Sequence, residues 1–265
     1  MAPTSILFYK EVGHSQEGAK ELVSLMGEKG VFDGPKPVRL LERLITLANL
    51  NDDSIVLDFF SGSATTAHAV MKRNAEKESH CKFIMVQLPE AVSEKKKDQG
   101  YKTICEIGED RIRRAGKKIK SEAGLLAKDL DIGFRVLRLD SSNMEDVYYT
   151  PDKFDEANLF NMVDNVKTDR NEEDLLFQVM LELDVPLSAS IKQEQFAGKN
   201  VFVVADGHLI ATFDKDVNES TVTEIAKRKP NFFVMRDASA ANDNVLDNFE
   251  QIFKHYSPDT ICKIL

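Results

Sequence analysis

The chain has 265 residues, enough for one large domain or two smaller ones. Its 42% hydrophobic and 30% charged residues are typical of a folded globular protein and exclude a disordered one. No apolar run approaches the roughly 18 residues that cross a membrane, and the amino terminus lacks the basic and apolar regions of a signal peptide. We therefore expect a cytoplasmic protein without a membrane partner.

The net charge of −9 disfavours binding of nucleic acid by the whole surface, although a local basic patch is compatible with such binding. The three cysteines, Cys81, Cys105 and Cys262, are an odd number and show no paired zinc-ligand spacing. The five histidines form no His-x-x-x-His pattern. The composition thus predicts neither a disulfide framework nor a metal site.

The amino-terminal region predicts a short β-like run at residues 6–9 and an amphipathic helix over 15–26. Further along, Pro35 and Pro37 flank Lys36 and stiffen the backbone there. Pro37 also suits the first turn of a helix, and the apolar residues that follow it form a helical stripe. From these residues alone, the segment is a loop that precedes an ordinary core helix.

Residues 54–71 predict a strand, a tight loop and a helix. An apolar run ends in Asp58, and the small residues 61–66 follow before the helical pattern begins. Small residues let a ligand approach the backbone, and the helix start directs free N–H groups at it. An acidic residue at the strand end recurs in nucleoside-type sites. On spacing alone, a purely structural turn stays open as the alternative.

A second strand is expected at residues 82–88, where the near-continuous apolar run favours a strand covered on both faces. In nucleotide-binding folds a polar side chain at the end of this strand holds the ribose hydroxyls. Gln87 and Glu90 are the candidates for that role. The alternative is a surface turn with no ligand.

Residues 101–120 predict a long helix with one apolar side and a basic second half. The main interpretation is a solvated face with cations near the helix carboxyl end, where the dipole favours them. The alternative is contact with phosphate groups. A third strand is expected at residues 133–139. The basic residues concerned are Arg111, Arg113, Arg114, Lys117, Lys118 and Lys120.

The composition shifts after residue 140, where Asp, Asn and Ser replace the periodic apolar residues. We expect a domain over 1–140, a connector over 141–171 and a small α/β domain over 172–265. In the last, Asp206-Gly207-His208 is a hairpin signal and Thr221 with Glu224 fits a capping box. Its expected elements are a helix ending before Pro186, strands at 201–205, 209–213, 232–235 and 261–265, and helices at 221–227 and 243–255.

The wording of several segments resembles a known family. Asp-Phe-Phe-Ser-Gly-Ser-Ala-Thr-Thr, residues 58–66, is similar to the cofactor segment of β-class amino-methyltransferases that act on DNA. Ala64 stands where the family usually has its second glycine, which narrows the backbone freedom of the loop. The Lys-Pro pair at 36–37 also matches this family. The segments Gly-Tyr-x-Thr-Ile and Arg-Ile-Arg-Arg-Ala narrow the resemblance to the modification subunits of type III restriction-modification systems, and it covers nearly the whole chain.

The resemblance implies an α/β fold, with a partial, Rossmann-like S-adenosylmethionine-dependent methyltransferase sheet followed by a smaller carboxyl-terminal α/β domain. It also implies that S-adenosylmethionine is the cofactor. The residues expected to contact it are Lys36, Pro37, Asp58, Phe60, Gly62, Ser63, Gln87 and Glu90.

The family's catalytic segment is absent from the sequence. That segment, Asp-Pro-Pro-Tyr or a close variant, accepts the amino hydrogens of a flipped base and stacks on its ring. The chain has eight prolines and no Pro-Pro dipeptide, so we assign no catalytic residue. We expect the carboxyl-terminal portion of an adenine-N6 methyltransferase, which would need a partner chain that supplies catalysis.

The implied partners are DNA, through the full-length protein, a restriction subunit and a second modification subunit. The main alternative is a non-catalytic interaction module that docks such subunits. A dinucleotide enzyme is a weaker alternative, because the loop lacks Gly-x-Gly-x-x-Gly.

Overall fold

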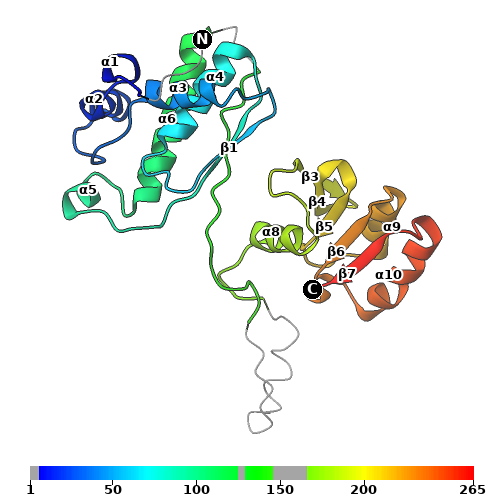
Figure 1. Ribbon diagram of the computed structural model, residues 1–265. Helices are drawn as coiled ribbons and strands as arrows, with labels where there is room; N and C mark the ends of the chain where they lie inside the picture. The colour runs from blue at the N-terminus through cyan, green and yellow to red at the C-terminus, as the bar shows by residue number, and fades with distance from the viewer. Residues whose placement is uncertain (1–5, 125–128, 146–165) are drawn as a thin grey trace. The chain divides into compact units, whose positions relative to one another are not determined.

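The computed structural model describes residues 6–124, 129–145 and 166–265. The chain divides into two compact units, one up to Arg138 and one from Leu139 onward (Figure 1). The connector expected at 141–171 falls largely outside the described residues, so the predicted domain limits stay a prediction. Within the described ranges, no helix is both long and apolar enough to span a bilayer.

The first unit is mostly helical and contains one small parallel sheet. The sheet pairs β1 with β2, and Leu57 lies opposite Ile84. In chain order the elements are α1 (Tyr9–Val12), α2 (Ser15–Met26), α3 (Val38–Leu47), β1 (Ile55–Asp58), α4 (Thr65–Lys77), β2 (Lys82–Met85), α5 (Glu94–Asp98) and α6 (Ile104–Ala123).

Helix α4 connects the two parallel strands and forms the centre of this unit. It packs against α3 and α6, and its buried residues contact the inner face of the sheet. These contacts form two hydrophobic clusters. Val56 of β1 packs in one cluster, Met85 of β2 packs in the other, and Phe83 of β2 packs in both. The core of the first unit therefore lies on one side of its sheet.

Three predictions for the first unit are wrong. Residues 6–9 are not a strand, because Phe8 instead accepts hydrogen bonds from the backbone N–H groups of Glu11 and Val12 and begins α1. Residues 133–139 are described and contain no strand, and Leu139 is fully exposed. Strand β2 is covered on one face only, because its outward side chains are exposed.

The second unit is built around a mixed five-stranded sheet of order β3-β4-β5-β6-β7. The pairs β3–β4 and β4–β5 are antiparallel, and the pairs β5–β6 and β6–β7 are parallel. The elements are α8 (Glu172–Glu182), β3 (Ile191–Phe196), β4 (Lys199–Val204), η4 (Ala205–Gly207), β5 (Leu209–Thr212), α9 (Glu219–Lys227), β6 (Phe232–Met235), η5 (Asp237–Ser239), α10 (Asp243–Tyr256) and β7 (Ile261–Ile264).

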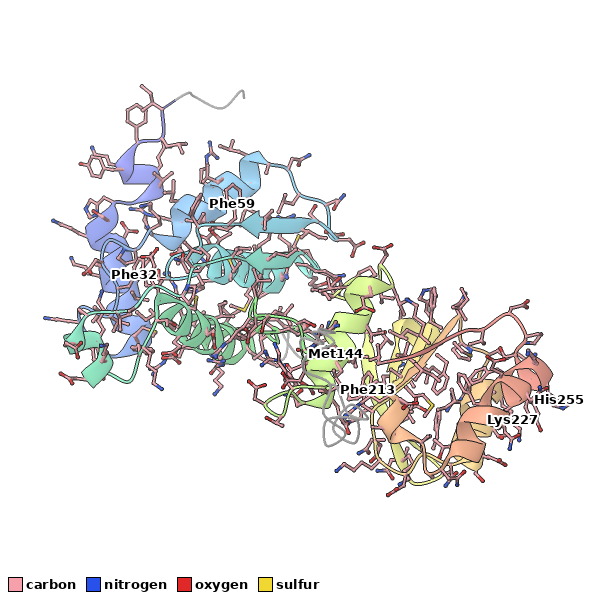
Figure 2. The ribbon with its side chains drawn as sticks, turned by 90° about the horizontal axis from the view of Figure 1, so that it is seen from below. Phe32, Phe59, Met144, Phe213, Lys227 and His255 are labelled. Carbon is pink, nitrogen blue, oxygen red and sulfur yellow. The ribbon has the colours of Figure 1, made fainter. Side chains whose placement is uncertain are left out.

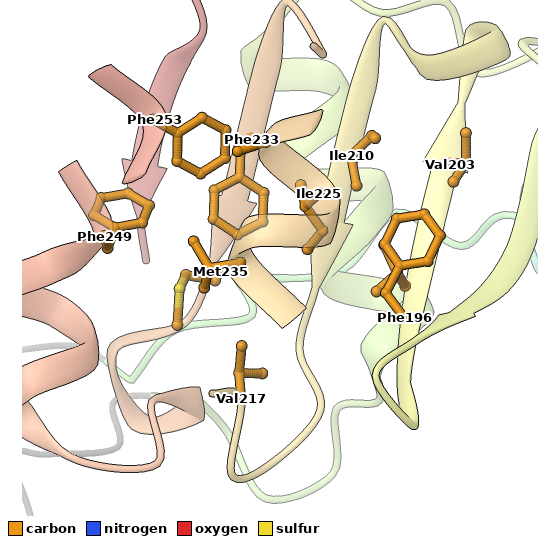
Figure 3. Close-up of a cluster of buried hydrophobic side chains, with 12 residues drawn as sticks. Phe196, Val203, Ile210, Val217, Ile225, Phe233, Met235, Phe249 and Phe253 are labelled. Carbon is orange, nitrogen blue, oxygen red and sulfur yellow. The ribbon is translucent and has the colours of Figure 1, made fainter. Parts of the chain in front are cut away.

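Hydrophobic clusters cover both faces of this sheet. On one face, α9 and α10 pack against side chains such as Ile210 and Phe233, and the ring of Phe233 stacks on Phe253 with centroids 5.0 Å apart (Figure 3). On the other face, α8 packs against alternate strand residues such as Leu209 and Val234. The alternation along each strand thus supplies two separate cores.

The predicted hairpin about residues 206–208 is confirmed, because β4 and β5 are antiparallel neighbours. The predicted capping box is wrong. Asn218 caps α9 and accepts a hydrogen bond from the backbone N–H of Thr221 at 3.1 Å, since an Asn three residues earlier meets the cap geometry first. Glu224 accepts from the backbone N–H of Ala197 instead. Strand β3 was not predicted, because its polar sequence Ile-Lys-Gln-Glu-Gln-Phe lacks an apolar pattern.

Candidate cofactor site

The loop between β1 and α4 turns tightly through two left-handed residues, Gly62 with φ +51° and Ala64 with φ +57°. Glycine adopts this conformation without penalty, whereas a residue with a Cβ pays roughly 1–2 kcal/mol. Ala64 is the residue that replaces the family's second glycine. The loop therefore makes a tight turn although Ala64 has a Cβ, and the left-handed backbone angle of Ala64 is strained.

Gly62 is held from two sides. Its backbone N–H donates to Oε1 of Gln87 at 2.8 Å. A Cβ at this position would lie 3.1 Å from the ring of Phe32, which is labelled in Figure 2. A larger residue at position 62 would be strained by both the backbone angle and the ring, so the structure explains the glycine.

Asp58 connects the two ends of the loop. Its Oδ2 accepts a hydrogen bond from Oγ1 of Thr66 at 2.5 Å, and its Oδ1 accepts from the backbone N–H of Phe60 at 3.2 Å. The Phe60 side chain is 82% exposed and tilts against Phe59 with ring centroids 5.2 Å apart. The acidic residue thus fixes the loop, and an aromatic side chain stands free beside it.

The Lys-Pro segment meets the same loop. The carbonyl oxygen of Lys36 accepts a hydrogen bond from Oγ1 of Thr65 at 3.4 Å. Pro37 is buried and precedes the first residue of α3, whose backbone N–H donates to Oε2 of Glu21 at 2.9 Å. The structure therefore brings together two segments that lie some way apart in the sequence.

Helix α2 leaves no room beneath the Lys-Pro segment. A Cβ on Gly18 would lie 2.3 Å from the carbonyl oxygen of Pro35 and 2.8 Å from the backbone nitrogen of Pro37. Such distances are not compatible with any side chain at this position. Gly18 thus lets the helix and the segment approach closely enough to fix the position of Lys36.

Gln87 and Glu90 lie at two different places. Gln87 contacts the loop, since its side chain accepts from Gly62 and its carbonyl oxygen accepts from Sγ of Cys105 at 3.3 Å. Glu90 is exposed, and its backbone carbonyl accepts a hydrogen bond from the N–H of Ile104, at the start of α6, at 3.0 Å. In this structure the Gln87 amide braces the loop, and the Glu90 side chain faces solvent.

Arg111 is a residue of this site that the sequence interpretation missed. It is fully buried, and its Nη1 donates to Oγ of Ser63 at 2.9 Å and to Oγ1 of Thr65 at 2.6 Å. Burial lowers the pKa of Arg111 to about 10, while the charge of Glu21 acts in the opposite direction. The guanidinium therefore stays charged at neutral pH, directly behind the loop.

The prediction that the basic residues of this helix face solvent is wrong for Arg111, which is buried, and is confirmed for its neighbours Arg113 and Arg114. Arg113 and Arg114 are exposed and pair with Glu109 and Asp110 one turn away. The signal that separates Arg111 from them is a spacing of four, because Arg111 falls in the same helical row as buried residues. That row is Ile107, Arg111, Ala115 and Ile119.

Two features of the loop favour an anionic group, and the carboxylate of Asp58, which bonds Thr66 in the first turn of α4, opposes them. No side chain caps the start of α4, so the helix dipole and the N–H groups of its first turn act on the loop. The buried charge of Arg111 lies behind the same loop and adds to this positive potential. Together they suit a carboxylate or phosphate group.

Comparison with known proteins shows what the first part of the chain is similar to. Residues 4–115 match the model of the DNA methylase family N6_N4_Mtase. The chain is 43% identical over 133 residues to the Mod subunit of the type III restriction-modification enzyme StyLTI of Salmonella typhimurium, and 41% identical over 138 residues to that of EcoPI from Escherichia phage P1. The Mod subunit of EcoP15I from Escherichia coli is 37% identical over 132 residues.

Each of these matches covers about half of this chain, 47–51%, and 20% of the relative. The chain thus spans about a fifth of the length of the relatives it matches. The resemblance expected from the loop, the Lys-Pro pair and the arginine-rich helix is confirmed: residues 4–115 match the DNA methylase family model, and the chain is similar to the modification subunits of type III restriction-modification systems.

Proposed function

We propose that this chain is the S-adenosylmethionine-binding part of a site-specific DNA adenine-N6 methyltransferase of a type III restriction-modification system. The observation that carries the proposal is the convergence of Asp58, Gln87, the Lys36 carbonyl and Arg111 on one six-residue loop, residues 61–66. A loop that needed only to reverse the chain would not require a buried cation behind it. The family match supports the same assignment.

The residues present fit the cofactor. Arg111 and the uncapped start of α4 provide positive potential for its carboxylate, and Gly62 keeps the backbone of the loop accessible. Phe60 offers an exposed aromatic face beside the loop. When bound, S-adenosylmethionine supplies an activated methyl group on its sulfonium.

We assign the eight predicted residues to three parts of the cofactor site. Lys36 and Pro37 would contact the methionine end, as the resemblance implies. Asp58, Phe60, Gly62 and Ser63 would form the loop around the cofactor. Gln87 and Glu90 would serve the ribose, and Gln87 would then exchange its hydrogen bond with Gly62 for one with a hydroxyl group.

The chemical step is assigned to residues outside this chain. Freeing the lone pair of an exocyclic nitrogen needs acceptors for its two hydrogens, which the Asp-Pro-Pro-Tyr segment provides in the family. A partner polypeptide with that segment would complete the enzyme. DNA, a restriction subunit and a second modification subunit would then be partners of the assembled protein.

Calorimetric titration with S-adenosylmethionine tests the proposal. We expect micromolar binding by the native chain, about −8 kcal/mol. Gly62→Val should abolish it, because the added side chain would meet Phe32 and adopt an unfavourable backbone angle. The matched control is Gly198→Val, which changes another left-handed glycine, in the second unit, where nothing lies within 4 Å of its Cβ position. Absence of binding by a folded native chain would overturn the proposal.

A second candidate is an interaction module without cofactor. The exposed apolar face of the β1–β2 sheet favours it, since such a face is typical of a docking surface. A folded chain that binds no S-adenosylmethionine but binds a subunit of the system would support this candidate.

A further inference from the structure

A cavity of about 660 Å³ lies between helices α2, α4 and α6 of the first unit. Helix α6 packs against both α2 and α4, and the cavity separates those two. The residues assigned above to S-adenosylmethionine are all described, and none of them lines this cavity. Its volume is in the range of pockets that hold small organic molecules. It is therefore a candidate ligand site that shares no residue with the cofactor site.

His68 of α4 lines the cavity and has unused hydrogen-bonding capacity. Its Nδ1 is buried and has no hydrogen-bond partner among the described residues, and the same is true of Nε of Arg111, whose charge acts on His68. Burial and the charges of Arg111, Lys118 and Lys72 lower the pKa of His68 to about 3, so the imidazole is neutral at pH 7. A neutral imidazole among cations suits an anionic ligand that accepts a hydrogen bond.

Helices α4 and α6 run side by side in the same direction along the cavity. A Cβ on Gly108 would lie 3.5 Å from the Cβ of Ala64, at the start of α4. Two turns further along α6, a Cβ on Gly116 would lie 3.4 Å from Sδ of Met71. Residues that follow one another along either helix therefore lie at increasing distance from the cofactor loop.

This direction sorts the charges of the cavity. His68 is followed one turn later by Lys72 and two turns later by Glu76. On α6, Lys118 is likewise followed one turn later by Glu122. The cavity thus has a cationic half toward the cofactor loop and a carboxylate half one turn farther away.

The lysines of the cationic half keep donors for a ligand. Lys118 lies 3.8 Å from Glu122 and Lys72 lies 3.8 Å from Glu76, distances longer than a hydrogen bond. Lys72 also pairs with Glu42 at 2.5 Å, which uses one of the three N–H donors of its ammonium group. Both ammonium groups can therefore donate to an anion without losing their present partners.

Helix α2 adds one residue of each sign. Lys20 is exposed and lines the cavity. Glu21 lines it as well, but its Oε2 accepts from the backbone N–H of Val38 at 2.9 Å, and its charge also acts on the buried Arg111. The contribution of α2 to the net charge is zero, so the sorting along α4 and α6 decides which group binds where.

We propose that this cavity binds a small phosphate monoester whose body carries hydroxyl groups. The phosphate would accept hydrogen bonds from His68, Lys72 and Lys118. The hydroxyl groups would donate to Glu76 and Glu122. A monoester projects its phosphate from one end, whereas sugars flank the phosphodiester of duplex DNA on both sides and would keep it from an imidazole recessed between helices. The inference goes beyond the proposed function and does not depend on it.

Calorimetric titration of the full chain with ribose 5-phosphate tests the proposal. We expect a dissociation constant below about 1 mM, and at least about tenfold weaker binding of ribose or of inorganic phosphate, because each offers only half of the contacts. Lys118→Met should weaken binding of ribose 5-phosphate about tenfold, since it removes a charged donor. The matched control Lys117→Met removes the same charge from an exposed neighbour on α6 that does not line the cavity, and it should leave affinity unchanged.

The carboxylate half has its own test. Glu122→Ala removes an acceptor for the hydroxyl groups and should weaken binding of ribose 5-phosphate without weakening that of inorganic phosphate. All three substituted residues are exposed, so circular dichroism of each variant should match that of the native chain. Binding of ribose 5-phosphate that is insensitive to Glu122→Ala, and no tighter than that of inorganic phosphate, would contradict the assignment of the hydroxyl groups and overturn the proposal as stated.

Nuclear magnetic resonance locates the ligand. The imidazole resonances of His68, identified by their loss in His68→Gln, should shift on addition of ribose 5-phosphate, whereas those of the exposed His255 should not. Absence of binding by the folded native chain, or equal weakening in Lys118→Met and Lys117→Met, overturns the inference. Displacement of ribose 5-phosphate by S-adenosylmethionine would do so too, because it would place both ligands in one site. Since S-adenosylmethionine has no phosphate group, its own titration tests the proposed function separately.

Discussion

The two units use similar strands in different ways. In the second unit, five strands carry apolar residues on both faces, and helices cover each face. In the first unit, two strands carry the same kind of residues, but helices cover one face and leave the other exposed. Strand sequence alone therefore does not determine burial, which depends on whether the chain also supplies the covering layer.

Because of this difference, we expect the two units to respond differently to substitution. The second unit contains its own core on both sides of its sheet, as Figure 3 shows for one of them. The first unit depends on the packing of α2, α4 and α6 around the loop at residues 61–66. We expect substitutions in the second unit to act on folding, and substitutions around the loop to act on folding and cofactor binding together.

The largest effect is expected in the core of the second unit. Phe233 is fully buried between Phe249 and Phe253, so Phe233→Ala should lower the free energy of unfolding of this unit by about 3–5 kcal/mol. Hydrogen exchange followed by mass spectrometry measures each unit separately. The control Leu57→Ala, at an exposed strand residue of the first unit, should cost less than about 1 kcal/mol. Equal costs would refute the contrast between the sheets.

The next effect concerns the contact between α2 and the Lys-Pro segment. Gly18→Ala should destabilise the first unit by about 1–3 kcal/mol, because its Cβ would overlap the carbonyl of Pro35. It should also weaken cofactor binding, since Lys36 would move. Gly108→Ala is the control for stability on another helix of this unit, where the nearest atom, the carbonyl oxygen of Gly62, lies at an ordinary contact distance of 3.4 Å from the Cβ position. A stable Gly18→Ala protein with unchanged affinity would contradict the packing described here.

Arg111 should matter more than its neighbours. Arg111→Met removes the donor to the buried hydroxyl groups of Ser63 and Thr65, at a cost of about 1–3 kcal/mol in the first unit. The affinity for S-adenosylmethionine should fall as well. Arg113→Met, on the exposed side of the same helix, should cost at most about 0.5 kcal/mol and leave affinity unchanged. Similar results for both variants would contradict a role of buried Arg111 in supporting the loop.

The first unit should also lose stability in mild acid because of His68. Desolvation by burial and the charges of Arg111, Lys118 and Lys72 lower the pKa of His68 from 6.5 to about 3. Between these values the unfolded chain binds a proton that the folded chain does not. Stability is therefore complete above about pH 6.5 and falls toward pH 3 by up to about 1.4 kcal/mol per pH unit.

Unfolding measured from pH 7 to pH 4 should show this slope in the native chain and a flatter one in His68→Gln. The control His255→Gln changes an exposed histidine of the second unit and should leave the slope unchanged. A native chain whose first unit is equally stable at pH 7 and pH 5 would refute burial of a neutral His68.

The smallest effect is expected at Ala64. Ala64→Gly relieves the left-handed backbone strain but removes a buried methyl group, and these opposing terms are each about 1 kcal/mol. The stability of the first unit should change by less than about 1 kcal/mol. A loss above about 2 kcal/mol, measured by hydrogen exchange, would show that the methyl contact outweighs the strain.

Local pattern predicted the elements that local chemistry determines. The helices that begin near residues 15, 38 and 104, the loop at 61–66 and the hairpin about Gly207 follow from periodicity and turn residues. The prediction of a strand at 133–139 is wrong, because an apolar run becomes a strand through tertiary pairing, which a local pattern does not encode. Strand β3 was not predicted because its sequence is polar, and its extended backbone is instead stabilised by antiparallel pairing with β4.

The position of the loop could be predicted from the sequence, whereas the hydrogen bonds that Arg111 and Gln87 make to it could not. The resemblance pointed to Asp58, Gly62 and the Lys36-Pro37 pair, and the structure places all of them at or beside the loop. Arg111 was grouped with exposed arginines because charge normally indicates a solvated face. Its position in a row of buried residues would have identified it. The use of Gln87 as a brace for Gly62 depends on tertiary contact, which no local pattern encodes.

The most direct test of the cofactor site is hydrogen exchange of the native chain with and without S-adenosylmethionine. The account predicts slower exchange at the amides of residues 61–66 and near Lys36 when the cofactor is added, with no change in the second unit. Unchanged exchange across the first unit at millimolar cofactor would contradict the claim that this loop binds it.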